Sequence, residues 1–130
     1  MVCLDTTFII DLLRGKEEIS SLKDTLDRTE SRLAIAAPSV MELWVGAQLV
    51  SKSNEEKAKI DELLQSLIVL ELNEHNAKLA GEIEAALIHN GQTIDTEDCM
   101  IAGIAISNGE TLVTRDAHFA RISGLRVLKY

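Results

Sequence analysis

Four acidic side chains in this sequence are far apart along the chain, yet each stands beside the end of an expected strand or the start of an expected helix. They are Asp5, Glu42, Asp98 and Asp116. Carboxylates that meet at one place repel one another, and burial increases the cost of their charges unless a cation neutralises them. Oxygen ligands with open water positions suit Mg²⁺ or Mn²⁺, and such an ion can activate a water molecule against a phosphodiester. The set therefore predicts metal-dependent phosphodiester hydrolysis.

Each of the four acids also has a purely structural explanation. Asp5 and Asp116 each precede an expected helical turn and can cap it by accepting a hydrogen bond from a free N–H. Glu42 completes a Ser-x-x-Glu capping-box pattern. Asp98 can be a first-turn acid favoured by the helix dipole, behind a cap at Asp95. The two interpretations differ in whether the four side chains converge.

Two arginines, a histidine and a fifth acid near these positions are further candidates. Arg14 and Arg115 are candidates for a phosphate contact because a guanidinium pairs well with phosphate oxygens, and each also fits a plain surface role. His118 lies close to Asp116, and we expect local packing and a nearby hydrogen bond rather than a role as a base. Asp11 is expected on a solvated helix face.

The elements that must position the acids alternate between short apolar runs and helical patterns. Expected strands are Met1–Leu4, Leu33–Ala37, Ile68–Leu72, Thr111–Thr114 and Leu125–Leu128. Expected helices are Phe8–Leu13, Lys16–Arg32, Val40–Ala47, Asn54–Leu67, Glu74–Asn90 and Asp95–Ser107. Runs such as LAIAA are typical of strands buried on both faces of a parallel sheet, so the alternation predicts an α/β domain. In such sheets ligands bind beyond the carboxyl ends of the strands, where the four acids would lie.

The composition limits the class of protein. The chain has 130 residues, with 13 Lys and Arg against 21 Asp and Glu and a net charge of −8. Proteins that hold nucleic acid by charge alone are seldom acidic, so a nucleic-acid partner requires metal ions or a local basic patch. Cys3 and Cys99 form no CxxC pair and are expected as reduced core residues. No apolar stretch approaches the ~20 residues that span a bilayer. One soluble, cytoplasmic domain over residues 1–130, with no membrane partner, is therefore expected.

Four motifs, taken in order, resemble those of the PIN-domain family, and in size the VapC-type toxins of bacterial and archaeal toxin–antitoxin pairs. They are LDTTFIIDLL at the start, PSVMELWVGA after the second expected strand, DCMIAGIAI in the apolar helix and LVTRDAHF near the end. Together they run over nearly the whole chain. The resemblance implies a PIN-like three-layer α/β/α domain whose mainly parallel central sheet has about five strands, as many as the sequence pattern contains.

Carried over residue by residue, the family's metal-binding acids fall on Asp5, Glu42, Asp98 and Asp116. The resemblance also places supporting hydroxyl groups beside the acids at Thr6 and Thr114. It implies an endoribonuclease that depends on Mg²⁺ or Mn²⁺ and cuts RNA, a homodimer, and a cognate antitoxin that blocks the site. Thr7 stands where Asn or Ser is frequent and Gly103 replaces a common Ala, and neither change removes an acid.

Two alternatives compete with the nuclease. A catalytically silent PIN-like module would use the same fold to bind a partner protein, but it has no need for four acids that repel one another. An acid-nucleophile phosphatase would attack phosphate with Asp5, and such enzymes commonly carry a second Asp two residues later, where this chain has Thr7. The structural test of the metal site is convergence of the four carboxylates in one cleft.

Overall fold

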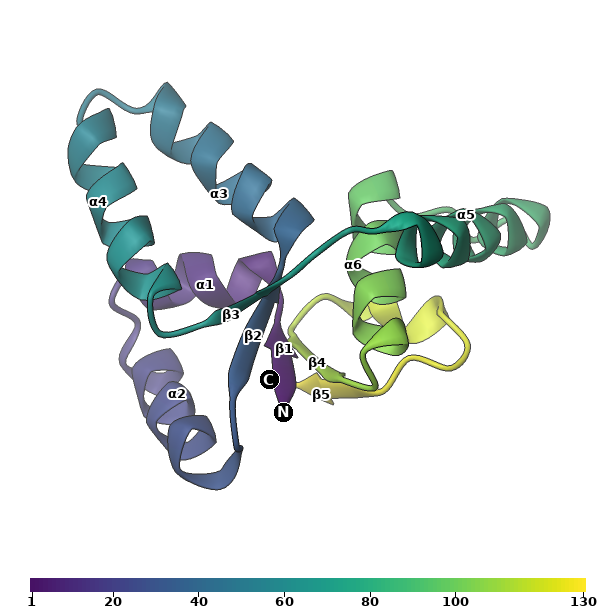
Figure 1. The fold of residues 1–130 in the computed structure, drawn as a ribbon, viewed down its shortest axis with the longest axis horizontal. Coiled ribbons are helices and arrows are strands. Elements are labelled where there is room, and N and C mark those ends of the chain that lie inside the picture. The colour runs from purple at the N-terminus through teal and green to yellow at the C-terminus, as the bar shows by residue number, and fades with distance from the viewer.

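A computed structural model describes residues 1–130, and its central element is a sheet of five parallel strands (Figure 1). The strands are β1 (Val2–Leu4), β2 (Leu33–Ala36), β3 (Ile68–Leu70), β4 (Thr111–Thr114) and β5 (Val127–Lys129). They lie in the order β3-β2-β1-β4-β5, and every neighbouring pair is parallel. The predicted α/β class is confirmed. Because β1 lies between β2 and β4, the carboxyl ends of these three strands meet at the middle of one sheet edge.

The helices cover both faces of this sheet. They are α1 (Thr6–Leu13), α2 (Glu17–Thr29), α3 (Ala37–Leu49), α4 (Ser53–Leu64), α5 (Glu74–His89), α6 (Thr96–Ser107) and the short 3-10 helix η1 (Ala117–Arg121). Figure 1 shows α1 to α4 on one side of the strands and α5 and α6 on the other, which confirms the three-layer α/β/α arrangement. None of these helices has both the length and the apolar composition needed to cross a membrane.

Helices α1 and α3 begin two and three residues earlier than their apolar pattern predicted, because each follows a strand with no loop between them. α1 begins at Thr6 instead of Phe8, directly after Asp5. α3 begins at Ala37, which the sequence pattern had assigned to the strand. Backbone N–H groups in the first turn of a helix have no partner within the helix. Pro38 fits this turn because proline has no N–H group.

The fifth strand begins at Val127, two residues later than predicted. Val127 is paired with Leu112 of β4, whereas Leu125 packs against the core beyond the strand. The side chains of β5 are exposed, as expected for a strand at the edge of a sheet. After β5, the Tyr130 N–H donates to the Thr114 carbonyl at 3.4 Å, which brings Tyr130 to the end of β4.

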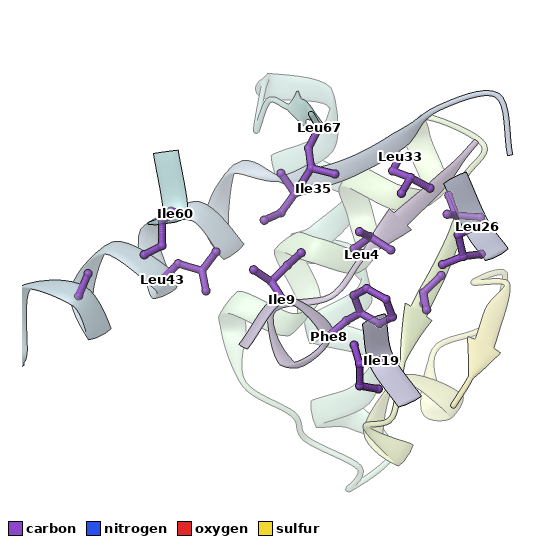
Figure 2. Packing of buried hydrophobic residues seen from close by; sticks show 13 residues of the cluster. Leu4, Phe8, Ile9, Ile19, Leu26, Leu33, Ile35, Leu43, Ile60 and Leu67 are labelled. Carbon is purple, nitrogen blue, oxygen red and sulfur yellow. The ribbon is translucent and has the colours of Figure 1, made fainter. Parts of the chain in front are cut away.

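Apolar side chains fill both faces of the sheet in two clusters of 13 buried residues each. In β1, Val2 and Leu4 belong to the cluster beneath α1 to α4, whereas Cys3 belongs to the cluster beneath α5 and α6. Figure 2 shows the first cluster, in which Leu43 of α3 and Ile60 of α4 extend the packing into the helix pair. Both cysteines are buried free thiols, as predicted. Burial on both faces explains why the three central strands, β1, β2 and β4, read as continuous apolar runs.

Helix α6 packs against α5 with almost no space at Gly103. A Cβ atom built at Gly103 would meet the Asn76 carbonyl oxygen at 3.0 Å and the Ala80 backbone nitrogen at 3.1 Å. These separations are shorter than ordinary van der Waals contacts, so glycine permits the close approach. Since α6 carries Asp98 in its first turn, this packing fixes where that carboxylate lies relative to the sheet edge.

Candidate metal centre

Asp5 lies at the junction of β1 and α1 and is only 3% exposed. Its Oδ1 accepts a hydrogen bond from the Thr6 backbone N–H at 2.8 Å, so Asp5 does cap helix α1. Its Oδ2 accepts from the Thr114 hydroxyl at 2.7 Å and from the Thr7 hydroxyl at 3.0 Å. Capping therefore accounts for one oxygen, and side chains of α1 and β4 orient the other.

Thr114 connects Asp5 to a second acid. While its hydroxyl donates to Asp5, the same oxygen accepts a hydrogen bond from the Asp116 backbone N–H at 3.0 Å. Asp116 Oδ1 in turn accepts from the His118 backbone N–H at 2.9 Å and caps η1. The predicted capping by Asp116 is confirmed, and it coexists with a position beside Asp5.

Glu42 does not form the capping box that its spacing from Ser39 suggested. The N-cap position of α3 is Ala36, so Ser39 lies inside the first turn, and its hydroxyl has no hydrogen-bond partner. Glu42 Oε1 instead accepts a hydrogen bond from the Thr6 hydroxyl at 3.0 Å. Because α3 starts directly at the end of β2, its second turn carries Glu42 towards α1 and Asp5.

Asp98 is the acid on which the charges of the others converge. Asp95 occupies the N-cap position of α6, but its side chain makes no capping hydrogen bond, so that part of the structural explanation is wrong. Burial raises the pKa of Asp98 to about 7, and the neighbouring carboxylates add to the rise. The contributing acids are Asp5, Asp116, Asp95 and Glu42. All four predicted site acids therefore interact electrostatically across the sheet edge.

The cluster contains little compensating positive charge. Burial is the main cause of the raised pKa of both Asp5 and Glu42; hydrogen bonds from neighbouring threonines oppose it and neighbouring carboxylates add to it. None of the ion pairs in the structure involves Asp5, Glu42 or Asp98. Thr6 contacts both Asp5 and Glu42, Thr114 contacts Asp5 and the Asp116 backbone, and Asp98 lies within 4.8 Å of Asp116, so the four acids lie together. Their negative charge fits a divalent cation.

His118 is the basic group nearest to the acids. Asp98, Asp116 and His118 each offer a ligand atom, and these three atoms lie within 4.8 Å of one another. The predicted local contact of His118 is present, with Nδ1 3.2 Å from Asp116 Oδ1, but its side chain is 53% exposed rather than packed. The neighbouring Phe119 is the residue that packs in the core. Oxygen atoms with one adjacent imidazole form a donor set that a divalent metal can occupy.

Asp11 is the residue for which the sequence-based expectation is wrong. It is 1% exposed rather than solvated, and it forms ion pairs of 2.9 Å with Arg115 Nε and with Lys16 Nζ. The available signal was its position three residues after Phe8, on the buried face of α1. A charged residue at such a position requires partners, and the sequence does not name them because Arg115 is 104 positions away.

The two candidate phosphate-binding arginines lie in different surroundings. Arg115 contacts α1 through Asp11. Arg14 lines a groove between α1, α3 and α4 that opens beside Glu42. The other lining residues are mainly apolar and include Ile10, Leu13, Leu43, Ala47, Val50 and Ile60. A bound segment with apolar side chains would fit this groove.

Comparison with known proteins places the fold and the site in context. The sequence matches the family model described as PIN domain over residues 2–125. It is 31% identical over 125 residues to the tRNA(fMet)-specific endonuclease VapC of Salmonella typhimurium, with 95% of this chain and 93% of that protein covered. It is also 27% identical over 137 residues to Ribonuclease VapC11 of Mycobacterium tuberculosis, with 100% and 99% covered.

Solved structures of VapBC complexes contain chains with the same fold as this protein. The DNA-bound VapBC complex of Salmonella typhimurium contains a chain with a TM-score of 0.88 at 30% identity, covering 99% of this chain and 98% of that one. VapBC2 of Rickettsia felis, bound to a DNA fragment from its promoter, has a chain with a TM-score of 0.92 at 24% identity, covering 100% and 99%, which is a likeness of fold. With a family match over nearly its whole length and acids converging where the motifs predicted, the chain belongs to the PIN-domain family, in its VapC branch.

Proposed function

We propose that this protein is a metal-dependent endoribonuclease, the toxin component of a toxin–antitoxin pair, formed by one domain over residues 1–130. The observation that carries the proposal is the meeting of four carboxylates at the carboxyl edge of the sheet. Three of them, Asp5, Glu42 and Asp98, form no ion pair with a basic side chain. Relatives named as ribonucleases and endonucleases support the reaction class.

The metal-binding residues in this proposal are Asp5, Glu42, Asp98 and Asp116. Mg²⁺ or Mn²⁺ held by such oxygens would lower the pKa of a water ligand and stabilise the negative charge that develops on a phosphodiester being cut. The threonines hold the carboxylates in position: Thr114 and Thr7 donate to Asp5, and Thr6 donates to Glu42. These hydrogen bonds orient the Asp5 and Glu42 carboxylates within the cluster. His118 adds a nitrogen donor beside Asp98 and Asp116.

The substrate in this proposal is RNA, and two relatives carry names that specify tRNA(fMet). Arg14 and Arg115 are the proposed phosphate contacts, since guanidinium groups pair with phosphate oxygens. Arg14 lies beside Glu42 in the groove, and Arg115 immediately precedes Asp116. Each arginine thus adjoins one of the acids.

The proposed partners are a cognate antitoxin and a second copy of the chain. The similar solved structures are VapBC complexes. The apolar groove between α1, α3 and α4 is suited to an antitoxin segment, because its occupant would lie against Glu42 and obstruct the metal centre. Exposed apolar side chains on α3, including Met41 and Val45 at 55% and 51% exposure, offer a contact surface for a homodimer.

The alternatives find no support in the site. A silent binding module has no use for converging, uncompensated carboxylates. The phosphatase would need an acid at position 7, where Thr7 instead donates a hydrogen bond to Asp5 Oδ2.

The test is cleavage of total cellular RNA by the purified, antitoxin-free chain in Mg²⁺ or Mn²⁺, repeated with a chelator. Asp98→Asn should abolish cleavage, because it removes a charged ligand from the centre of the cluster. Asp61→Asn is the matched control, since Asp61 is an exposed acid on α4. Cleavage that persists with chelator or in Asp98→Asn would contradict the proposal, as would a folded chain that cuts no RNA.

A further inference from the structure

Asp11 is a buried charge that the proposed metal centre does not use. It is 1% exposed and forms 2.9 Å ion pairs with both Arg115 and Lys16. Burial alone would raise the pKa of Asp11, but the hydrogen bonds and charges of Lys16 and Arg115 outweigh burial and lower it. Asp11 is therefore a firmly ionised carboxylate that holds two cations at once.

Stability alone is a weak explanation for this arrangement. Burying an ion costs several kcal/mol, and well-packed apolar residues often serve a fold equally well. The rest of the buried face of α1 is apolar at Phe8 and Ile9, so an apolar residue at position 11 would simply continue that face. The acid at this position is better explained by the two cations that it holds.

Arg115 is held through one of its three guanidinium nitrogens. Its Nε donates to Asp11 Oδ2, and neither terminal nitrogen forms an ion pair with a carboxylate. Its side chain is 49% exposed. A guanidinium anchored at Nε keeps its terminal N–H groups in a fixed plane, and this fork pairs with two oxygens of one phosphate.

Arg115 stands between two groups of the metal centre along the chain. Val113 faces the cluster beneath α1, and Thr114 turns to the other side to reach Asp5. Arg115 returns to the α1 side, where Asp11 binds it, and Asp116 then follows beside Thr114. Arg115 and Asp116 thus have different partners after the end of β4: Arg115 donates to Asp11, and the Asp116 backbone N–H donates to the Thr114 hydroxyl.

Tyr130 connects the two sides. Its ring packs edge-on against Phe8, with ring centroids 5.3 Å apart, and its hydroxyl lies 3.5 Å from the Thr7 hydroxyl. Thr7 donates in turn to Asp5. Tyr130 also raises the pKa of Arg115, after the larger effect of Asp11. Tyr130 therefore acts electrostatically on Arg115 and lies next to the threonine that donates to Asp5.

The distribution of charge makes this position unusual. Lys23, Lys59 and Lys78 are each matched with one acid on their own helix. At Asp11, two cations share a single carboxylate. In a chain with a net charge of −8, this site leaves an excess positive charge beside the acids, where a polyanion would need it.

We propose that Asp11 is a positioning residue that holds the Arg115 guanidinium as a clamp for an RNA phosphate adjacent to the one that is cut. Lys16 adds to the positive charge of the clamp. The inference rests on the proposed RNA-cleaving function and gives its substrate a second point of attachment. Because the clamp contacts the backbone, it acts on every RNA sequence, and Asp11 acts only through Arg115.

The test is a double-mutant cycle of Arg115→Ala and Asp11→Asn, with KM and kcat measured on single-stranded RNA over a series of salt concentrations. We expect Arg115→Ala to raise KM about tenfold, the effect of one lost charge-assisted hydrogen-bonded contact, with little change in kcat. The slope of log(kcat/KM) against log[salt] should fall by about 0.7, the value for one phosphate of a single strand. Asp11→Asn should shift both quantities in the same direction by less, and should add nothing in the Arg115→Ala background. Arg121→Ala is the control, because Arg121 donates only to the Thr93 carbonyl.

An unchanged KM and salt slope in Arg115→Ala would overturn the inference. So would an Asp11→Asn effect that is equally large with or without Arg115, because Asp11 would then act as a structural lock. Unfolding curves of each variant separate a loss of fold from a loss of binding. Arg115→Lys provides a second check, since it should restore the salt slope but not KM.

Failure of the proposed function has a different signature. If the unmutated chain cuts no RNA, that proposal fails, and the clamp is tested by equilibrium binding of a fluorescently labelled single-stranded RNA in Ca²⁺. A salt slope that depends on Arg115 in this assay supports the clamp. Binding that is identical with and without Arg115, or no binding at all, overturns it.

Discussion

Asp5 immediately precedes helix α1 and Asp11 lies within it, and both are almost fully buried, at 3% and 1% exposure. Their surroundings nevertheless act on their charges in opposite directions. Around Asp5, burial outweighs the hydrogen bonds from three threonines, and the pKa of the carboxyl is raised. Around Asp11, hydrogen bonds and charges from Lys16 and Arg115 outweigh burial, and the pKa is lowered. The chain supplies counter-ions for Asp11 and none for Asp5.

This contrast separates two kinds of buried acid. An acid with its own cations is electrostatically complete, and its charge serves to hold those cations in place. A group of acids without cations is costly in isolation, so it indicates a counter-ion that comes from solution. Hydrogen bonds alone do not distinguish the two, because Asp5 accepts three of them.

Asp5 is the acid of this pair that has no counter-ion from the chain. Removing its charge should have the largest effect on RNA cleavage. In Asp5→Asn, the side-chain oxygen can still accept the Thr6 N–H and cap α1, but the ligand set loses a negative charge. We expect RNA cleavage to fall by at least about 100-fold, beyond the loss typical of residues that only support metal ligands. Circular dichroism should be unchanged, and Asp61→Asn is again the control. Cleavage close to that of the unmutated chain would remove Asp5 from the metal site.

The comparison is sharpened by two substitutions whose effects on stability should have opposite signs. Asp11→Asn leaves two cations with a neutral partner, so we expect it to lower the free energy of unfolding by about 1–3 kcal/mol. Asp98→Asn removes a charge that burial and neighbouring carboxylates oppose, so it should stabilise the metal-free protein at pH 8. Urea unfolding with chelator measures both. Destabilisation by both substitutions would mean that the clustered acids carry no net electrostatic cost.

The pH dependence of stability follows from the same contrast. The ordinary pKa of an Asp side chain is 3.8, and in the fold the pKa of Asp98 is raised to about 7. Between these two pH values the folded chain therefore binds more protons than the unfolded chain. The contribution of Asp98 to the free energy of unfolding is therefore fully present below about pH 4 and is lost as the pH rises to about 7. Asp11 acts in the opposite sense: its contribution is present above its ordinary pKa of 3.8 and is lost as the pH falls through its lower folded pKa.

Melting temperatures of the chelator-treated protein from pH 4 to pH 8 provide the measurement, because pH 4 is close to the ordinary Asp pKa of 3.8 and pH 8 is above the value of about 7 that Asp98 has in the fold. We expect a decline towards pH 8 that Asp98→Asn reduces and that Mg²⁺ or Mn²⁺ removes. A metal-free protein that becomes steadily more stable up to pH 8 would contradict the raised pKa of the cluster.

The smallest expected effect concerns His118, the imidazole beside the oxygen ligands. Mg²⁺ prefers oxygen, whereas an imidazole favours transition metals. We expect His118→Ala to weaken Mn²⁺ binding by up to about 10-fold, as for a supporting residue, and to leave Mg²⁺ binding nearly unchanged. Calorimetric titration of metal-free protein measures both, with His75→Ala as the control. Equal losses for both ions, or none, would show that His118 only contacts Asp116.

The fold was predictable because its three central strands are buried on both faces, so β1, β2 and β4 read as short apolar runs between helical patterns. The four acids were predictable because residues at the carboxyl ends of parallel strands share one edge. Exact element ends were not, since no loop separates β2 from α3 and Ala37 suits either element. The same short connection made the Ser39 capping box wrong.

The environment of Asp11 could not be predicted from sequence, although its burial could have been suspected. Helical periodicity places it on the face that carries Phe8. The partner that makes burial possible, Arg115, directly follows β4, and only the strand order brings the end of β4 beside α1. Long-range pairing of charges depends on topology, which local patterns do not contain.

The hydrogen bond from Thr114 to Asp5 joins residues 109 positions apart, and it has a consequence for the timing of synthesis. Domains emerge from the ribosome from the N-terminus onwards, so Asp5 is exposed long before β4 can insert beside β1. Until that insertion, Asp5 lacks the hydroxyl that orients it and Asp116 has no fixed place. On the proposed function, a growing chain that does not yet include β4 therefore has an incomplete metal centre and would not cut RNA. Cleavage would begin only once β4 has been added beside β1, which is also when an antitoxin would find the assembled metal centre to obstruct.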